Sequence, residues 1–243
     1  MELNKIYCMD CFEFLHQIPK KSIDLIITDP PYLHEKGGGK THGTEGKSKI
    51  ANSEMFNFNS PMMKNMSSFG EEQIYCLLDE FKRIMKKMNC YIFCNDSQLL
   101  YYLLWAKNNK KKTTVLIWEK PLSILNRNRF SQNVEYIVRI YDTGTALNLL
   151  DIENNPDKKD YYSKVRKFNP YKGKSKIHPL QKPYDYIKGL IELNSKEGDI
   201  ILDTFSGSGQ VLKVAKDLNR NFLGVEIDEK YYNLSIKYVY GKD

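Results

Sequence analysis

Residues 200–209 read Ile200-Ile201-Leu202-Asp203-Thr204-Phe205-Ser206-Gly207-Ser208-Gly209, and this stretch decides the fold. It has the pattern of an apolar strand that ends in a carboxylate and continues into a tight glycine turn. An amphipathic helix follows from about Gln210 to Leu218. Glycines allow the backbone to approach a ligand closely, and the start of a helix offers free N–H groups. The stretch therefore predicts a nucleotide-type crevice.

A second predicted strand, Asn221 to Val225, leads to Glu226, which lies 23 positions beyond Asp203. An acidic residue at this distance typically accepts hydrogen bonds from ribose hydroxyls. The loop is not a dinucleotide fingerprint, because Leu212 stands at the third glycine position, and no Lys-Ser/Thr pair of a phosphate-binding loop follows. The pattern favours a nucleoside cofactor such as S-adenosylmethionine. A strand–helix turn without a ligand is the alternative.

The rest of the chain alternates short apolar runs with helical periodicity, which indicates a mostly parallel α/β sheet. The candidate strands are Lys5–Cys8, Asp24–Thr28, Cys90–Asn95, Thr113–Trp118, Val134–Ile140, Asp199–Asp203 and Asn221–Glu226. Helical spacing is clearest for Ile74, Leu77, Leu78, Phe81, Met85 and Met88, and again for Val211, Leu212, Ala215 and Leu218.

Composition suits a single globular domain spanning residues 1–243, with 41% hydrophobic and 28% charged residues. No apolar run approaches the roughly 18 residues of a membrane helix, and no cleavable apolar stretch follows the N-terminal residues. Five cysteines do not suit a closed disulfide framework. We therefore expect a cytoplasmic protein without membrane association. The formal net charge of +7 permits a polyanionic partner without requiring one.

Two cysteine pairs raise the question of a zinc site. Cys8 and Cys11 form a C-x-x-C motif, and Cys90 and Cys94 lie four residues apart. On a strand, that separation spans about 13 Å. Two thiolates so far apart cannot share one ion at about 2.3 Å each. The four histidines show no ligand spacing either, so we expect no metal.

Asp29-Pro30-Pro31-Tyr32 follows the predicted strand that ends at Thr28. Ligands of open α/β sheets bind at the carboxyl ends of strands. Two prolines fix φ and remove two N–H donors, which leaves a rigid turn with free carbonyls. The Asp29 carboxylate and the Pro30 carbonyl are acceptors beside an aromatic ring, an arrangement that suits an exocyclic NH₂ group on a base. An ordinary proline turn is the alternative.

With His178-Pro179-Leu180-Gln181-Lys182-Pro183, these motifs resemble those of the amino-methylating DNA methyltransferases. The order of the motifs, with Asp-Pro-Pro-Tyr first and the glycine loop near the C-terminus, is similar to the β group of that family. The resemblance runs from about Asn4 to Tyr240. It implies a Rossmann-like, mostly parallel seven-stranded α/β sheet with helices on both faces, circularly permuted relative to other class I methyltransferases.

The resemblance also implies S-adenosylmethionine as the cofactor. The residues that it assigns to cofactor binding are Asp10, Cys11, Asp29, Gln181, Lys182, Asp203, Phe205, Ser206, Gly207, Ser208, Gly209, Glu226 and Ile227. Glu226 would hold the ribose, and Asp10 would lie near the adenine. The sequence departs from the family at Thr204, Gln210 and Leu180, where the family usually shows Pro, Thr and Thr.

The implied activity is direct transfer of the sulfonium methyl group to an exocyclic amine, with Asp29, Pro30, Pro31 and Tyr32 as the catalytic turn. A base inside a duplex cannot reach such a pocket, so the target must be flipped out. Asp at the first position resembles adenine-methylating members, so the expected target is N6 of adenine in a short DNA site. The alternatives are N4 of cytosine, an RNA adenine, and an inactive cofactor-binding or nucleic-acid-binding module. The missing third glycine counts against a nicotinamide oxidoreductase.

Two segments interrupt the alternation, and we expect both to be mobile loops on a rigid sheet. Residues 33–70 are rich in Gly, Ser and Asn. Residues 141–177 are basic with interleaved aromatics, and they replace the larger recognition domain that family members often carry. Backbone phosphates attract such a strip. The residues expected to contact DNA are Arg127, Arg129, Lys164, Arg166, Lys167 and Lys172.

Double-stranded DNA is therefore the expected partner. A restriction endonuclease that acts on the same site is a further partner that the resemblance allows. The recognition sequence stays open, as does the choice between a monomer and a homodimer.

Overall fold

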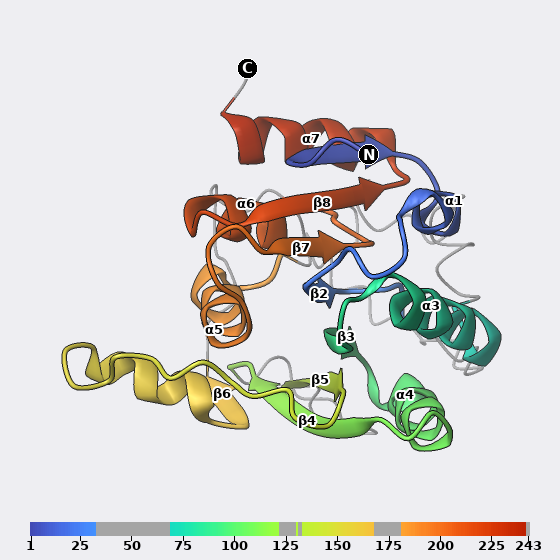
Figure 1. The fold of residues 1–243 in the computed structure, drawn as a ribbon. Coiled ribbons are helices and arrows are strands. Elements are labelled where there is room, and N and C mark those ends of the chain that lie inside the picture. Colours follow the sequence, from blue (N-terminus) through green and yellow to red (C-terminus); the bar gives the residue numbers. More distant parts are fainter. Residues whose placement is uncertain (33–68, 122–129, 131–132, 168–180, 242–243) are drawn as a thin grey trace, which may run out of the picture.

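The computed structural model describes residues 1–32, 69–121, 130, 133–167 and 181–241. At its centre lies one eight-stranded sheet with the strand order β1-β8-β7-β2-β3-β5-β4-β6 (Figure 1). The strands are β1 (Lys5–Cys8), β2 (Leu25–Thr28), β3 (Asn89–Cys94), β4 (Lys112–Glu119), β5 (Val134–Tyr141), β6 (Val165–Lys167), β7 (Ile200–Asp203) and β8 (Asn221–Glu226). The seven strands predicted from the apolar runs are confirmed to within one residue at each end.

Helices cover both faces of the sheet, as expected. One face carries α1 (Cys11–Gln17), α3 (Glu71–Ile84) and α4 (Asp96–Asn108), and the other carries α5 (Tyr184–Asn194), α6 (Gln210–Asp217) and α7 (Glu229–Tyr240) (Figure 1). The predicted apolar stripe is confirmed in α3, where Ile74, Leu77 and Phe81 are fully buried. Among the described helices, none combines the length and apolarity needed to cross a membrane.

The central strands are buried on both sides, which explains their continuous apolar runs. In β2, Leu25 and Ile27 pack beneath α5 and α6, whereas Ile26 packs with α1 and α3 on the opposite face. Strands β1, β8, β7, β2 and β3 run parallel, and only β5 runs antiparallel to its neighbours β3 and β4. Parallel sheets need this double cover.

The eighth strand is a correction to the expected seven. β6 pairs in parallel with β4, and a 3-10 helix, η2 (Pro156–Tyr162), precedes it. Residues 156–167 therefore carry secondary structure where a structureless loop over 141–177 was expected. The strand has three residues, two of them exposed, so it left no apolar pattern in the sequence. Residues 33–68 and 168–177 of the two expected loops lie outside the described residues.

The strand order brings four distant segments to one edge of the sheet. β7 lies between β8 and β2, and all three are parallel, so their carboxyl ends meet. The glycine loop after β7 thus lies beside the Asp-Pro-Pro-Tyr turn after β2. Glu226 ends β8 at the same edge, and Asp10 follows β1. Open α/β sheets bind ligands in crevices of this kind.

Gly224 of β8 permits the close packing of α6 on the sheet. A Cβ atom at this position would lie 2.2 Å from Cδ1 of Leu212. We expect Gly224→Ala to lower the free energy of unfolding by about 1–3 kcal/mol, because overpacking displaces neighbouring side chains. Urea unfolding measures the loss. Leu212→Ala removes the obstruction, so the double variant should lose less than the two single losses together. Strictly additive losses would contradict this contact.

Candidate active site

The Asp-Pro-Pro-Tyr turn is anchored from the first turn of α4. Gln98 is fully buried, and its Nε2 donates hydrogen bonds to the carbonyls of Pro31 (2.9 Å) and Phe69 (3.0 Å). The Gln98 side chain thus links the Asp-Pro-Pro-Tyr turn to Phe69, the residue that precedes the N-cap of α3. Sequence reasoning missed Gln98. The signal for it is a polar residue at the start of a helix that directly follows a fully buried strand.

Lys182 binds Asp29 in a buried position between two carboxylates. Its Nζ lies 2.7 Å from Asp29 Oδ2 and 2.9 Å from Glu135 Oε2, and the residue is 6% exposed. The same ammonium lies 3.4 Å from the hydroxyl of Tyr32. Lys182 was assigned to the cofactor from the sequence, whereas the contacts described for its ammonium are with the Asp-Pro-Pro-Tyr turn and with Glu135 of β5. Glu135 was missed, because a single acid on β5 belongs to no motif.

The ion pairs act differently on the three charged groups. Burial raises the pKa of Asp29, although Lys182 opposes this effect. Burial has the same effect on Glu135, but Lys182 and Lys120 outweigh it and lower the pKa of that carboxyl. Burial disfavours the charge of Lys182, yet Asp29 and Glu135 prevail and raise its pKa. Asp29 is therefore more basic than an ordinary aspartate, whereas Glu135 is more acidic than an ordinary glutamate.

The glycine loop after β7 is held by hydrogen bonds to the end of β8. Gly207 and Gly209 have φ values of 47° and 77°, in the left-handed region that favours glycine. The Gly207 N–H donates to Glu226 Oε2 (2.8 Å). Ser206 is buried, and its hydroxyl donates to the Val225 carbonyl (3.1 Å). Ser208, two positions further along the loop, is also buried.

Two acids lie beside this loop without a cation, Asp203 buried at the end of β7 and Glu226 partly buried at the end of β8. Asp203 Oδ1 accepts hydrogen bonds from the Thr28 hydroxyl (2.9 Å) and the Phe205 N–H (3.2 Å). Burial raises the pKa of Asp203 to about 7, and burial also raises the pKa of Glu226. Among the described residues, no Lys or Arg forms an ion pair with either acid. Such a pair of acids fits a ligand that brings its own positive charge.

The remaining residues assigned to the cofactor lie around this edge. Asp10 caps α1, where its carboxylate accepts from the Phe12 N–H (2.8 Å), and Cys11 is buried behind it. Ile227 is 62% exposed directly after Glu226, so an apolar surface lies next to the acid.

Two further contacts support the glycine loop from its sides. Phe205 packs edge-on against Phe69, with ring centroids 5.5 Å apart. Gln181 Nε2 donates to Oε1 of Gln210, the first residue of α6, at 2.6 Å. Gln210 stands where the family usually has Thr, and here it links the start of α6 to the segment before α5.

The predicted DNA contacts separate into three groups. Arg166 is 4% exposed and packs over the ring of Tyr186 at 5.1 Å, so its prediction as a DNA contact is wrong. The side chain points inward because β6 pairs with β4 and turns its middle residue to the core. Lys164, just before β6, and Lys167, at its end, are exposed. Arg127, Arg129 and Lys172 lie outside the described residues.

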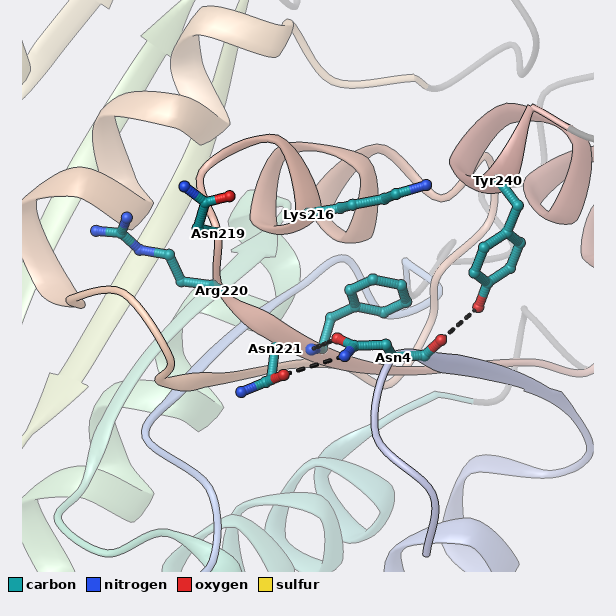
Figure 2. A pocket seen from close by; sticks show the side chains of 7 residues that line it. Asn4, Lys216, Asn219, Arg220, Asn221 and Tyr240 are labelled. Atoms are coloured by element: carbon teal, nitrogen blue, oxygen red, sulfur yellow. Dashed lines mark hydrogen bonds between the residues drawn. The ribbon is translucent and has the colours of Figure 1, made fainter.

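A hollow at the opposite edge of the sheet is a separate feature (Figure 2). It is lined by Asn4, Lys216, Asn219, Arg220, Asn221, Phe222 and Tyr240, at the amino ends of β1 and β8. Lys216 Nζ donates to the Val239 carbonyl (2.8 Å), and Arg220 donates to the Ser195 carbonyl (2.9 Å). Its cations are thus already engaged. No cluster of metal-ligating side chains occurs within the described ranges.

The raised pKa of Asp203 predicts how the free energy of unfolding changes with pH. Its pKa is about 7 in the folded protein and about 3.9 in an unfolded chain. The folded state therefore holds a proton that the unfolded state releases, and this stabilisation is lost as pH rises from about 4 to about 7. Asp203→Asn keeps an oxygen for both donors, so we expect it to exceed the wild type in free energy of unfolding by at least about 1 kcal/mol at pH 8.

The measurement is urea unfolding of both proteins between pH 4 and pH 8, with Asp142→Asn as control. A hydrogen bond from Lys111 lowers the pKa of Asp142 in spite of its partial burial. The control should therefore lose stability at pH 8, where Asp203→Asn gains it. Parallel pH curves for wild type and Asp203→Asn would contradict the assignment.

Comparison with known proteins extends these observations. The family model of the N6/N4 DNA methylases matches residues 23–237. Type II methyltransferase M.HinfI from Haemophilus influenzae is 30% identical over 262 residues, which cover 97% of this chain and 68% of that protein.

Two solved structures share the fold. The complex of M1.HpyAVI with SAM has a TM-score of 0.64 at 19% identity, covering 97% of this chain and 98% of that chain. The cytosine-N4-specific PvuII DNA methyltransferase has a TM-score of 0.67 at 15% identity, covering 95% of this chain and 84% of that chain. Because the family match spans both the Asp-Pro-Pro-Tyr turn and the glycine loop, in the order seen here, the chain belongs to the β group of the amino-methylating DNA methyltransferases.

Proposed function

We propose that this DNA methyltransferase uses S-adenosylmethionine to methylate the N6 amine of an adenine flipped out of a short DNA site. The proposal rests on the hydrogen bonding of the Asp29 carboxylate. Its Oδ1 is buried and has no hydrogen-bond partner among the described residues. The preceding residue, Thr28, is hydrogen-bonded to Asp203 at the glycine loop. A free acceptor next to the cofactor loop suits an amine that is methylated there.

The charges at the carboxyl edge support S-adenosylmethionine. Asp203 is buried and Glu226 is partly buried, and burial raises the pKa of both acids; a cationic ligand relieves the cost of ionising them. The left-handed glycines leave room for a close approach to the backbone. The complex of M1.HpyAVI with SAM supports the same ligand here. When bound, this cofactor supplies an electrophilic methyl group on a sulfonium.

The catalytic turn acts on the amine that receives this methyl group. An exocyclic amine is a poor nucleophile, because its lone pair is delocalised into the ring. Asp29 Oδ1 and the Pro30 carbonyl accept its two N–H bonds and localise the lone pair as charge develops. Asp29 Oδ1 then takes the proton that the amine loses, a role that its raised pKa favours. Tyr32 stacks on the base.

The identity of the base rests on the first residue of the turn. Asp29 supports adenine, because Asp at this position resembles the adenine-methylating members of the family. The likeness to the cytosine-N4-specific PvuII enzyme makes N4 of cytosine the second candidate. Both bases present an exocyclic amine to the same pair of acceptors, so the proposed chemistry is the same for either.

Asp29→Ala tests the role of the turn. We expect the rate of methyl transfer to fall at least about 100-fold, the range for loss of a preorganised charge-stabilising contact. The measurement is incorporation of labelled methyl groups into duplex DNA in a single turnover, with cofactor affinity determined in parallel. Cofactor affinity should persist. Asp217→Ala, at the far end of α6, serves as control and should keep the wild-type rate. Near wild-type transfer by Asp29→Ala would exclude the role.

Two exposed lysines at β6, Lys164 just before the strand and Lys167 at its end, give a test of DNA contact. Replacing both Lys164 and Lys167 with Gln should weaken binding to a short DNA duplex. Because two phosphate contacts are lost, the slope of the logarithm of the DNA-binding constant against the logarithm of the salt concentration should become smaller in magnitude by about two. Fluorescence anisotropy over a salt series measures both effects. Lys230→Gln with Lys237→Gln, on α7, gives a control of equal charge change that should keep the wild-type slope. An unchanged slope in the β6 variant would remove this strand from the DNA footprint.

A further inference from the structure

We propose that Glu135 of β5 is a positioning residue for Asp29 and acts through Lys182. Glu135 holds the lysine ammonium from a second side, so that Asp29 binds it through Oδ2 alone and keeps Oδ1 for the amine of the base. The inference rests on the methyl transfer proposed above. It gives a function to a buried acid that no motif of the sequence contains.

The contacts form a line of alternating charges. Asp29 Oδ2 and Glu135 Oε2 lie 2.7 Å and 2.9 Å from Lys182 Nζ. The other oxygen of Glu135, Oε1, forms an ion pair with Lys120. Two carboxylates and two ammonium groups thus make a neutral set. The side chain of Glu135 is 12% exposed and that of Lys182 is 8% exposed, so water does little to screen them.

Aromatic rings surround the lysine. Lys182 Nζ lies 4.8 Å from the ring centroid of Phe93, 5.7 Å from that of Tyr32 and 5.8 Å from that of Trp118. Lys120 Nζ also lies over the ring of Trp118, 4.8 Å from its centroid. Ring faces attract a cation but do not direct it in the way that a carboxylate oxygen does. The position of the ammonium therefore depends on the balance between Asp29 and Glu135.

Stability alone does not account for this cluster. Removing charged groups from water costs several kcal/mol per ion, and apolar residues of similar size often serve a fold as well. The four members come from four places, namely the turn after β2, the end of β4, β5, and the segment before α5. The line that they form ends at Asp29, the side chain whose free oxygen the proposed reaction needs.

The proposal predicts that two substitutions shift the pKa of Asp29 in opposite directions. Glu135→Gln removes a negative charge, and Lys182 then turns fully to Asp29, so the pKa of Asp29 should fall. Lys120→Gln removes a positive charge and leaves Glu135 to draw Lys182 away, so the pKa of Asp29 should rise. The other titratable groups that act on Asp29 are Tyr32 on its own turn, Asp203 at the end of β7, Cys94 at the end of β3 and Tyr102 on α4. Neither substitution changes them.

The experiment has two readouts on the full-length protein. Carbon-13 NMR of labelled aspartate carboxyls, with the Asp29 signal assigned by Asp29→Asn, gives the pKa of Asp29 without any reaction. Single-turnover methylation gives the rate, and cofactor titration gives the affinity. For Glu135→Gln we expect a lower pKa of Asp29, a rate at least about tenfold lower, and unchanged affinity for S-adenosylmethionine.

Glu192→Gln is the matched control. Glu192 lies on α5, its side chain is 14% exposed, and it forms one ion pair, with Lys158. This variant should leave both the pKa of Asp29 and the rate unchanged. If Glu135→Gln does not fold, Lys120→Gln alone tests the inference. The Lys120 side chain is partly exposed, so its replacement leaves the core intact, and the pKa of Asp29 is expected to rise.

The outcomes separate this inference from the proposed function. An Asp29 pKa that stays at the wild-type value in both variants would overturn the positioning role, whatever the rate. A wild type that methylates no DNA would overturn the proposed function, while opposite pKa shifts would still establish the coupling of Glu135 to Asp29. A rate and affinity lost together in Glu135→Gln would indicate a general structural role and count against the inference.

Discussion

The parallel pairing of β2 with β7 is the constraint on which the candidate active site depends. Leu25 pairs with Ile201 and Ile26 with Leu202, so the two strands end side by side. The hydroxyl of Thr28 then reaches the carboxylate of Asp203 at 2.9 Å. A slip of one residue would turn every side chain of β2 to the other face. The Asp-Pro-Pro-Tyr turn and the glycine loop owe their proximity to this register, although 175 positions separate Thr28 from Asp203.

The same edge of the sheet holds buried or partly buried carboxylates in two electrostatic situations. Asp29 has a cation of the protein, Lys182, which occupies one of its oxygens. Asp203 and Glu226 have hydrogen-bond donors but, within the described residues, no cation. The first arrangement suits an acceptor that works on a neutral amine, and the second suits a ligand that carries positive charge. Methyl transfer from a sulfonium to an exocyclic amine needs both arrangements side by side.

The sequence predicted the parts of the fold that local pattern encodes. The apolar runs located seven strands, and the positive φ values of Gly207 and Gly209 match the predicted glycine turn. Glu135 could not be found in this way, because it meets Lys182 across 47 positions and no short motif records that contact. The prediction that Arg166 contacts DNA was wrong for a related reason. In a strip of basic residues, only the pairing of β6 with β4 tells which side chain faces inward.

The central claim is that this edge of the sheet transfers a methyl group to an exocyclic amine of DNA. Nucleoside mass spectrometry tests it most directly, after unmethylated duplex DNA has been incubated with the protein and S-adenosylmethionine that carries a deuterated methyl group. The account predicts labelled N6-methyladenine. Labelled N4-methylcytosine would keep the chemistry and overturn the target base. A DNA digest without labelled nucleosides, from protein that binds the cofactor, would contradict the claim.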